Sequence, residues 1–526
     1  MIGLAQRVKK VYEIEWGSID NVASFMTLVE ELAITVAQIH CEPPLPIFPT
    51  KNTKNFIMAC KKSNDNREII RTTLSSFAKQ KYLMKDIRCF SMIYAEIARR
   101  DHEIFFRNFR NANVFKGTES LNDARMLYPL VHTRREAVLI VGGGIGGLAT
   151  ALSFAQAGIR VRLVEKNNNF REVGAGMQLA PNCSRLLARL GVLQQVQANA
   201  VFPKQIVWMD ALSGERLTCL DLGPKFVERF GYPYIVVHRA DLLNALYEAC
   251  IKNPLVTLET NRTVVTVDER PKSIMLECTT GMRYDCDMVV AADGLWSALR
   301  KYVCDDGDPL SVGYVTYRGT VGIDQVSKES GLENVQFWIG PDMHIVQYPV
   351  RRGQLFNQAA VFKSKLMPDH TDQWGTKEEL NERFSTGCDQ VKKILSLLQT
   401  NFRWPVYDRN PLSKWSRGRL VLVGDAAHPM LQYAAQGAAQ AIEDACALAD
   451  AYKKHGPSNI EAVFHEYEQE RIPLSSKVVH FARAIGDFAH QSGNAKTIRD
   501  EILCMHDMHD FDCITWLYEE KRNEKK

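Results

Sequence analysis

The chain has 526 residues, of which 46% are hydrophobic, and this is enough to bury large cores in two or three domains. A formal net charge of +4 is too small to indicate a nucleic-acid partner. The 13 cysteines are scattered without a CxxC pair or a metal-like cluster, which favours free thiols in a reducing compartment over disulfides or zinc. Without a membrane-length apolar run or a secretory signal, we expect a cytoplasmic protein with no membrane span and no metal.

Residues 1–136 carry no motif that indicates chemistry. Apolar residues recur at helical spacing in 22–39, and 68–111 also reads as helical and rich in cations. A proline-rich breaker at 42–49 follows the first of these segments. We expect a mainly helical N-terminal extension of unknown role, with a dedicated partner-binding domain as the alternative.

The first motif is a glycine-rich turn between a predicted strand at 138–141 and a predicted helix, with a second strand at 161–164. The glycines in GxGxxG spacing are Gly142, Gly144 and Gly147. They allow the tight turn, the approach of a pyrophosphate to the backbone and close helix packing, while the helix N-terminus receives phosphate charge. Glu165 ends the second strand, where it can accept hydrogen bonds from ribose hydroxyls. We predict a dinucleotide site, with a structural glycine turn as the alternative.

The segment after Glu165 alternates predicted strands and helices. Gly174 and Gly176 indicate either backbone that approaches a flat ligand or an ordinary turn. A helix is predicted at 183–190, and strand-like runs occupy 205–210, 234–237 and 256–267. Arg239 opens the next helix, where a cation would pair with pyrophosphate, although a surface charge is the other interpretation.

Two later strands end in acidic–glycine turns. One delivers Asp293 and Gly294, and the other delivers Gly424 and Asp425 directly to a predicted helix start. An aspartate at a strand end can bind a ribitol or ribose hydroxyl, and the dipole of a following helix can stabilise negative charge on a cofactor ring. Each turn alone is weak evidence, but the three motifs in this order are specific.

With these motifs, the chain from about 136 to about 518 resembles the single-component FAD-dependent aromatic hydroxylases, such as salicylate and hydroxybenzoate monooxygenases. The resemblance implies an α/β fold in which a Rossmann-like FAD-binding domain is interleaved with a β-sheet substrate domain and followed by C-terminal helices. It implies an FAD site that includes Glu165, Arg239, Asp293 and Asp425. NADH or NADPH would be the co-substrate. The sequence has a single GxGxxG, which agrees with this family because its members bind the nicotinamide nucleotide without a second Rossmann domain. A homodimer is the state that the family suggests.

The expected boundaries follow from these motifs. In chain order they are 1–136 for the extension, 137–310 for the FAD-binding domain with interleaved substrate-domain strands, 311–415 for the substrate domain, 416–455 for the Gly-Asp motif and its helix, and 456–526 for the C-terminal helical region. In the last two parts, helices are predicted at 438–452, 459–471 and 472–489. We expect Glu443 and Asp444 to make favourable contacts with a helix dipole, and the charged tail to be solvated.

A predicted strand around 338–351 carries an imidazole and a phenol. Alternation places His344, Val346 and Tyr348 on one face of it. From spacing alone, His344 fits a structural histidine better than a ligand-binding one. The sequence here and around Gln432 is most similar to 3-hydroxybenzoate 6-hydroxylases, and the resemblance implies that His344 and Gln432 lie at the substrate ring with Tyr348 nearby. Many salicylate hydroxylases have proline in place of Gln432, which ranks salicylate second.

The resemblance also implies the chemistry: NAD(P)H reduces the flavin, dioxygen adds, and a flavin hydroperoxide delivers oxygen to the ring. Attack para to a phenol hydroxyl is easier when that hydroxyl loses its proton, so a neutral imidazole near its ordinary pKa makes His344 the candidate base. Gln432 would orient the substrate by hydrogen bonds. The substrate carboxylate would pair with a buried arginine, for which the candidates are Arg318, Arg351 and Arg352.

We therefore expect conversion of 3-hydroxybenzoate to 2,5-dihydroxybenzoate (gentisate). The near alternative is a decarboxylating salicylate hydroxylase that forms catechol. An alternative of another class is a redox-responsive flavin-binding module that acts through residues 1–136 without hydroxylation.

Overall fold

The computed structural model describes residues 133–170, 175–327, 330–366, 375–398, 400 and 403–519. The chain divides into two units, 1–133 and 134–526, and everything below apart from Thr133 concerns the second unit. The helices expected at 22–39 and 68–111 and the charged tail beyond 519 lie outside the described residues.

The first sheet of the unit is mostly parallel. Its main strands, in spatial order, are β16 (Ser416–Arg417), β17 (Leu420–Leu422), β10 (Arg283–Ala291), β1 (Thr133–Val141), β2 (Val161–Val164) and β7 (Val256–Glu259), and β9 (Ile274–Cys278) and β8 (Val264–Glu269) continue from β10. The predictions of a strand at 138–141 and of another at 161–164 are confirmed. The single strand expected at 256–267 is wrong, because the chain turns between β7 and β8 with Asn261 in the left-handed region at φ 55°.

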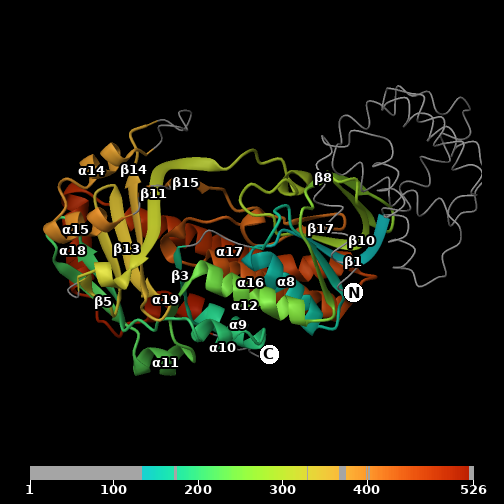
Figure 1. The fold of residues 1–526 in the computed structure, drawn as a ribbon, viewed down its shortest axis with the longest axis horizontal. Coiled ribbons are helices and arrows are strands. Elements are labelled where there is room, and N and C mark those ends of the chain that lie inside the picture. Colours follow the sequence, from blue (N-terminus) through green and yellow to red (C-terminus); the bar gives the residue numbers. More distant parts are fainter. Residues whose placement is uncertain are drawn as a thin grey trace, which may run out of the picture. The chain divides into compact units, whose positions relative to one another are not determined.

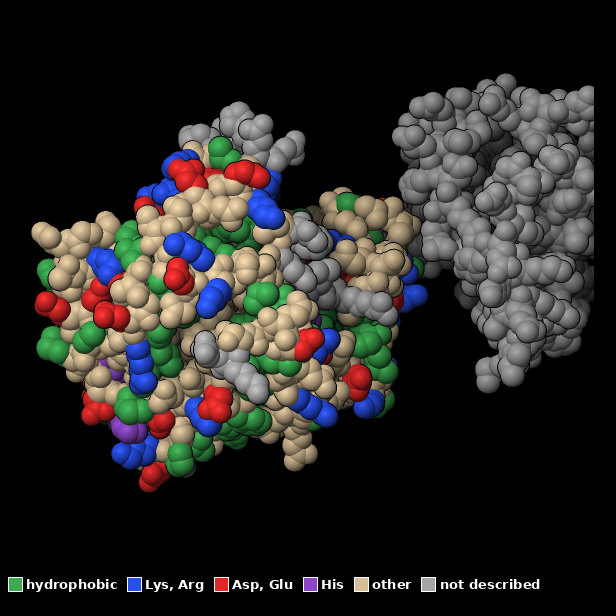
Figure 2. Space-filling model, turned by 60° about the vertical axis from the view of Figure 1, so that its left-hand side comes forward, with side chains coloured by type: hydrophobic (Ala, Val, Ile, Leu, Met, Phe, Trp, Pro, Cys, Tyr) green, Lys and Arg blue, Asp and Glu red, His purple; other side chains and the backbone are tan. Residues whose placement is uncertain are grey.

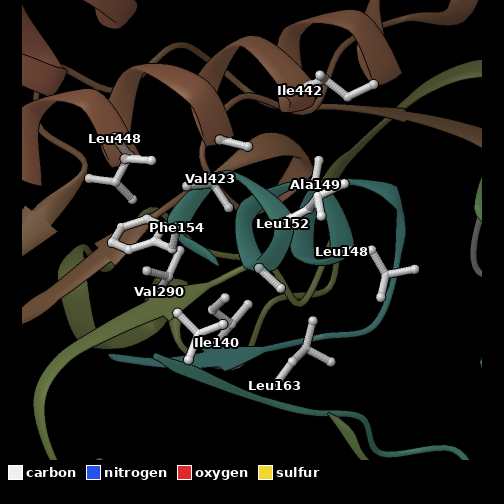
Figure 3. Packing of buried hydrophobic residues seen from close by; sticks show 14 of the residues in the cluster. Ile140, Leu148, Ala149, Leu152, Phe154, Leu163, Val290, Val423, Ile442 and Leu448 are labelled. Carbon is white, nitrogen blue, oxygen red and sulfur yellow. The ribbon is translucent and has the colours of Figure 1, made fainter. Parts of the chain in front are cut away.

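Helix α8 (Ile145–Gln156) explains its own composition by its position. It packs on the parallel sheet with one side and on α16 (Gly437–His455) with another (Figure 3). Leu148 and Leu152 are almost completely buried, as are Ile140 on β1 and Ile442 on α16. A helix that is covered on opposite sides has to be apolar nearly all round, which is what its sequence shows.

The second sheet has seven strands. Their order is β15 (Arg403–Asp408), β11 (Leu310–Gly322), β14 (Leu355–Lys363), β13 (Met343–Val350), β12 (Val335–Gly340), β4 (Gln205–Asp210) and β5 (Arg216–Asp221). Neighbours are antiparallel except β12 and β4. Strands β4 and β5 come from a segment between β2 and β10, so the chain leaves the first sheet, enters the second and returns. A separate ribbon pairs β3 (Gly176–Leu179) with β6 (Ile235–His238).

The remaining helices cover the sheets and join them. They are α9 (Pro181–Arg189), α10 (Leu193–Gln197), α11 (Pro224–Phe230), α12 (Arg239–Lys252), α13 (Arg300–Val303), α14 (Lys377–Arg383), α15 (Asp389–Leu397), α17 (Ile460–Ala489), α18 (Gly493–Cys504) and α19 (Asp512–Tyr518), with short 3₁₀ turns η2 (Ile323–Gln325), η4 (Gly424–Ala426) and η5 (Gln432–Ala434). Figure 1 shows the seven-stranded sheet and the parallel sheet at opposite ends of the second unit, with α16 and α17 between them. The two helices expected at 459–471 and 472–489 are one helix, α17, which continues through Pro473.

The expected α/β fold is confirmed for the described residues: a Rossmann-like sheet, an interleaved second sheet and C-terminal helices. No helix among them is long and apolar enough to cross a membrane. Side chains of both charge signs are interspersed over the face that Figure 2 shows, so this face has no large field of one sign.

Two glycines of the GxGxxG motif are required by packing. A Cβ at Gly147 would lie 1.9 Å from the carbonyl oxygen of Gly142. Gly142 itself has φ +110°, and a Cβ there would lie 2.3 Å from the carbonyl oxygen of Ala292. By contrast, a Cβ at Gly144 would meet no atom within 4 Å.

We expect Gly147→Ala to lower the free energy of unfolding of the cofactor-free protein by about 1–3 kcal/mol, because the methyl group has to push α8 away from β1. Urea denaturation followed by circular dichroism measures this. Gly144→Ala is the matched control and should stay within about 0.5 kcal/mol of the parent. Equal denaturation midpoints for Gly147→Ala and the parent would contradict the close packing of helix and strand.

Candidate active site

The predicted nucleotide motifs meet at one edge of the parallel sheet. The ends of the strands are joined by backbone hydrogen bonds: the Gly142 N–H donates to Val164, the Ala292 N–H to Val141 and the Val423 N–H to Ala291, at 2.8–3.0 Å. The three glycine-containing motifs and Glu165 therefore follow neighbouring carboxyl ends, which is where open α/β sheets bind ligands.

A cavity of about 910 Å³ opens at this edge and reaches the seven-stranded sheet. The residues predicted from the sequence that line it are Gly142, Gly144, Glu165, Arg239, Asp293, Gly294, His344, Tyr348, Gly424, Asp425 and Gln432. Gly147 does not line it, since it packs against Gly142 as described above. The structure thus brings together residues from segments almost 300 positions apart.

The N-terminus of α8 is suited to a diphosphate. Its N-cap residue, Gly144, provides no side-chain cap, and the first turn contains no acidic residue. Gly144, Ile145 and Gly146 of this turn line the cavity, and Arg239, the first residue of α12, lines the same space. Free N–H groups, a helix dipole and a guanidinium together fit the charge of a pyrophosphate.

Gly176 lines the cavity, and it also packs closely against protein side chains. A Cβ there would lie 2.6 Å from the Tyr348 ring and 2.8 Å from the Asn357 side chain, and the Gly176 N–H donates to Asn357 Oδ1 at 2.6 Å. The close approach is therefore to protein side chains of the second sheet. Gly174 lies outside the described residues.

Glu165, predicted to bind a ribose, lines the cavity. Its Oε2 accepts from the Gly143 N–H at 2.7 Å and its Oε1 from the Asn167 N–H at 2.9 Å, so the carboxylate is fixed at the end of β2. Oε1 also accepts from Asn167 Nδ2 at 2.6 Å, so Oε2 is the oxygen with a further lone pair that can accept from a ribose hydroxyl.

Asp293 holds its own loop in addition to lining the cavity. The Ser297 hydroxyl donates to its Oδ1 at 2.6 Å, and the Leu299 N–H donates to its Oδ2 at 3.2 Å. Burial raises the pKa of Asp293, although these hydrogen bonds oppose the rise. The loop continues to Arg300, which is 1% exposed and donates through Nη1 to the carbonyl oxygens of residues 426 and 427 at 2.8 Å. Arg300 therefore ties the Asp293 turn to the Gly424 turn, a role that its spacing after Asp293 could have signalled.

The Gly424–Asp425 turn does not open a long helix, contrary to the expectation. It forms the 3₁₀ turn η4, Gln432 begins a second such turn, and α16 starts only at Gly437. Gly424 has φ +58°, which favours glycine, and the Asp425 side chain is exposed towards the cavity. Asp425 can therefore reach a cofactor hydroxyl, while the N-terminus of α16 also faces the cavity through Gly437.

A buried network fixes this turn. Asp444 Oδ2 accepts from the Gly424 N–H at 2.9 Å and lies 2.5 Å from His428 Nε2, while Oδ1 accepts from Arg471 Nε at 2.8 Å. Arg471 also binds Glu443 Oε2 through Nη1 at 2.6 Å. The dipole role expected for Glu443 and Asp444 is wrong, because both acids pair with a buried arginine of α17. Burial alone would raise the pKa of Asp444, but His428 and Arg471 outweigh it and lower that pKa to about 2.

One face of the seven-stranded sheet forms the floor of the cavity. A row of paired residues crosses six strands there: Arg318, Ala359, Val346, Phe337, Trp208 and Thr218. His344 and Tyr348 lie one pleat to either side of Val346, which confirms that these three share a face. At about 3.4 Å per residue, His344 and Tyr348 are roughly 13 Å apart at Cα, so they face different parts of the cavity.

His344 is 2% exposed, and its Nδ1 lies 2.7 Å from Nε2 of His490. Burial, with His490, lowers the pKa of His344 well below the ordinary value of 6.5. The expectation of a nearly ordinary pKa is therefore wrong, although the ring is neutral as expected. At the other position, burial raises the pKa of Tyr348, so its phenol keeps its proton.

The three candidate arginines separate clearly. Arg351 and Arg352 form the turn between β13 and β14, both in the left-handed region, at φ 51° and 56°. Arg351 pairs with Asp241 at 3.1 Å, and Arg352 donates to the carbonyl oxygen of Ala198 at 2.6 Å. Of the three, only Arg318 lines the cavity.

The glycine turn, uncapped helix and strand-end acids define a protein that binds a dinucleotide. A family model described as an FAD binding domain matches residues 135–482. The chain is 35% identical over 390 residues to 3-hydroxybenzoate 6-hydroxylase 1 of Aquipseudomonas alcaligenes, covering 74% of this chain and 98% of that protein. It is 33% identical over 392 residues to the 3-amino-4-hydroxybenzoate 2-monooxygenase PtnB3 of Streptomyces platensis, covering 74% and 97%.

Among solved structures, a salicylate hydroxylase in complex with substrate matches with a TM-score of 0.59 and 25% identity, covering 72% of this chain and 96% of that one. The chain belongs to the single-component FAD-dependent aromatic hydroxylases. The predictions of the family, of FAD as the cofactor and of an FAD-dependent aromatic monooxygenase are confirmed. The individual site residues stay predictions.

We expect Asp444→Asn to lower the free energy of unfolding by about 3 kcal/mol, because it removes a buried charge that Arg471 requires. Thermal or urea denaturation measures the change. Asp450→Asn, on the same helix but in an exposed pair with Arg189, is the control and should cost less than about 0.5 kcal/mol.

The same pair predicts a pH dependence. The native pKa of about 2 lies below the unfolded value of 3.8, so the contribution of Asp444 is present above pH 3.8 and is lost as the pH falls towards 2. The parent should lose stability in this window, and Asp444→Asn should lose less. Parallel curves for the two proteins would show that Asp444 is not held ionised.

Proposed function

We propose that the enzyme hydroxylates 3-hydroxybenzoate to 2,5-dihydroxybenzoate, using NADH or NADPH and dioxygen. The observation that carries this proposal is the placement of a neutral imidazole and a guanidinium on one sheet face. His344 and Arg318 are separated by one pleat along the strands and by two strand spacings across them, roughly 12 Å at Cα. Two side chains that rise from one sheet face at this Cα separation can bind opposite ends of one small ligand, which suits a meta-hydroxybenzoate.

The roles follow from the chemistry of each side chain. The guanidinium of Arg318 binds the substrate carboxylate, and the ring of Trp404, 5.7 Å away, supports it. The Gln432 amide makes no hydrogen bond to another described residue, and it faces the cavity, so it can bind the substrate hydroxyl without adding charge. FAD, when bound, supplies electrons from NAD(P)H and activates dioxygen.

His344 acts as the base. Its Nε2 is opposite the nitrogen that bonds His490, and it accepts the proton of the substrate hydroxyl as electron density moves to the carbon para to that hydroxyl. Val346, Phe337 and Met430 give the cavity apolar walls that exclude water from the reacting oxygen. Tyr348 lies too far along β13 to share the same proton, and its place is at the far wall beside Gln178.

Relatives of similar identity act on other aromatic acids by their names, and this is why the substrate is a proposal. The non-hydroxylating alternative rested on residues 1–136, of which only 133–136 lie within the described residues.

Purified FAD-loaded enzyme should oxidise NADH or NADPH in step with dioxygen uptake when 3-hydroxybenzoate is added, and gentisate should accumulate in equal amount. Liquid chromatography identifies the product. Catechol formed from salicylate would replace this proposal with the decarboxylating reaction. Hydrogen peroxide alone, with either acid, would reject both substrates.

We expect Arg318→Met to reduce kcat/KM for 3-hydroxybenzoate by about tenfold to a hundredfold, because a charge-assisted hydrogen bond to the carboxylate is lost. With 3-hydroxybenzamide, which has no carboxylate, parent and variant should differ by less than about threefold. Arg351→Met, at the hairpin turn outside the cavity, is the matched control. Equal losses with acid and amide would remove Arg318 from carboxylate binding.

A further inference from the structure

The partner of His344 is a second histidine from the end of a distant helix. His490 directly follows α17, 146 residues after His344. The two rings are 15° from parallel, their centroids are 5.0 Å apart and the facing nitrogens are 2.7 Å apart. Rings at this separation lie edge to edge, which is the geometry of an in-line N–H···N hydrogen bond.

Aromatic side chains enclose this pair. The ring of Tyr314 lies parallel to His490 at 4.7 Å, and the ring of Tyr433 meets both imidazoles edge-on at 5.1 and 5.5 Å. Phe337 covers His344 at 5.2 Å. Aromatic rings therefore pack against both imidazoles of the pair.

The two ends of the imidazole pair face different environments. His344 Nε2 has no hydrogen-bond partner among the described residues, and His344 lines the cavity. His490 is partly exposed, and within the described part of the chain its Nδ1 has no partner either. One end of the pair thus faces the substrate and the other faces solvent.

The buried imidazole cannot keep the proton that it takes. Burial lowers the pKa of His344 far below that of a phenol, so a charged His344 beside a phenolate would return the proton at once. Burial also lowers the pKa of His490 to about 4; Arg499 on α18 and Lys363 on β14 act in the same direction, while Asp342 in the β12–β13 turn opposes them. The other titratable groups that face His490 are the phenols of Tyr314 and Tyr433. Neither imidazole is a proton store, and a neutral pair of this kind can only pass a proton on.

We propose that His490 is a positioning residue that relays the substrate proton from His344 to solvent. The substrate O–H bond breaks as an N–H bond forms at His344 Nε2; the His344 Nδ1–H proton moves to His490 Nε2; and the His490 Nδ1–H proton moves to water. Both rings end neutral with exchanged tautomers. When the product hydroxyl regains a proton, the same steps run in reverse and restore the starting tautomers. This inference rests on the proposed function, because it requires a phenolic substrate at His344.

The test follows proton transfer without turnover. Oxidised, FAD-loaded enzyme is mixed with 3-hydroxybenzoate in a stopped-flow instrument without NAD(P)H, phenolate formation is read by ultraviolet absorbance, and a pH indicator reads proton release. His490→Gln retains a hydrogen-bond acceptor for His344 Nδ1 but cannot relay. We expect phenolate formation and proton release to slow at least tenfold, while the dissociation constant of 3-hydroxybenzoate, read from the flavin spectrum, changes less than about threefold.

Two further variants separate relay from packing. In His490→Ala, added imidazole should restore the rate in proportion to its neutral fraction, which a purely structural role would not produce. Tyr314→Phe keeps the parallel ring and loses only the hydrogen bond to Asp342, so it should behave as the parent. If the His490→Gln protein loses FAD, the response of His490→Ala to added imidazole distinguishes a relay from a purely structural role.

The outcomes distinguish the two claims. A parent that does not bind 3-hydroxybenzoate, or binds it without forming phenolate, would overturn the proposed function. A parent that forms phenolate, with His344→Gln slow and His490→Gln as fast as the parent, would overturn the relay alone. Loss of rate in His490→Ala that imidazole does not restore would also overturn the relay.

Discussion

The buried ion pair between Asp444 and Arg471 is the contact on which the geometry of the cavity depends. Desolvating two charges is costly, and the cost is offset here because both carboxylate oxygens are engaged, by His428 and the Gly424 backbone on one side and by Arg471 on the other. The pair joins α16 to α17 beneath the cofactor edge of the parallel sheet. Asp444 thus links the last motif to the long helix through one carboxylate.

Local requirements made much of the fold predictable from the sequence. The freedom that Gly142 and Gly147 supply is needed within one strand–turn–helix unit, so their spacing indicates the structure directly. The wrong predictions concern segments whose secondary structure depends on tertiary contacts. The strand-like segment at 256–267 contains a turn at Asn261, and Pro473 lies inside a helix whose flanks are buried against other elements. The direct link from Gly424 to a long helix failed because two short 3₁₀ turns intervene.

In the candidate site too, some features follow from local sequence and others depend on tertiary contacts. Period-two alternation was enough to place His344 and Tyr348 on one face, since that depends on a single strand. The choice of Arg318 among three arginines required the register of β11, β14 and β13, which no local pattern contains. The lowered pKa of His344 and its bond to His490 depend on burial and on a helix end far along the chain, so neither has a signal in the sequence near His344.

The number of α17 residues between Arg471 and His490 is constrained by the contacts that these two residues make. Arg471, in the first half of α17, pairs with Asp444, and His490, just after the end of the helix, contacts His344. At 1.5 Å and about 100° per residue, adding or removing one residue between them would turn His490 away from its partner or break the ion pair. Substitutions on the exposed side of α17 can accumulate during evolution, whereas insertions and deletions in this interval cannot. The spacing of Arg471 and His490 should therefore change less among descendants of this chain than the identity of the residues between them.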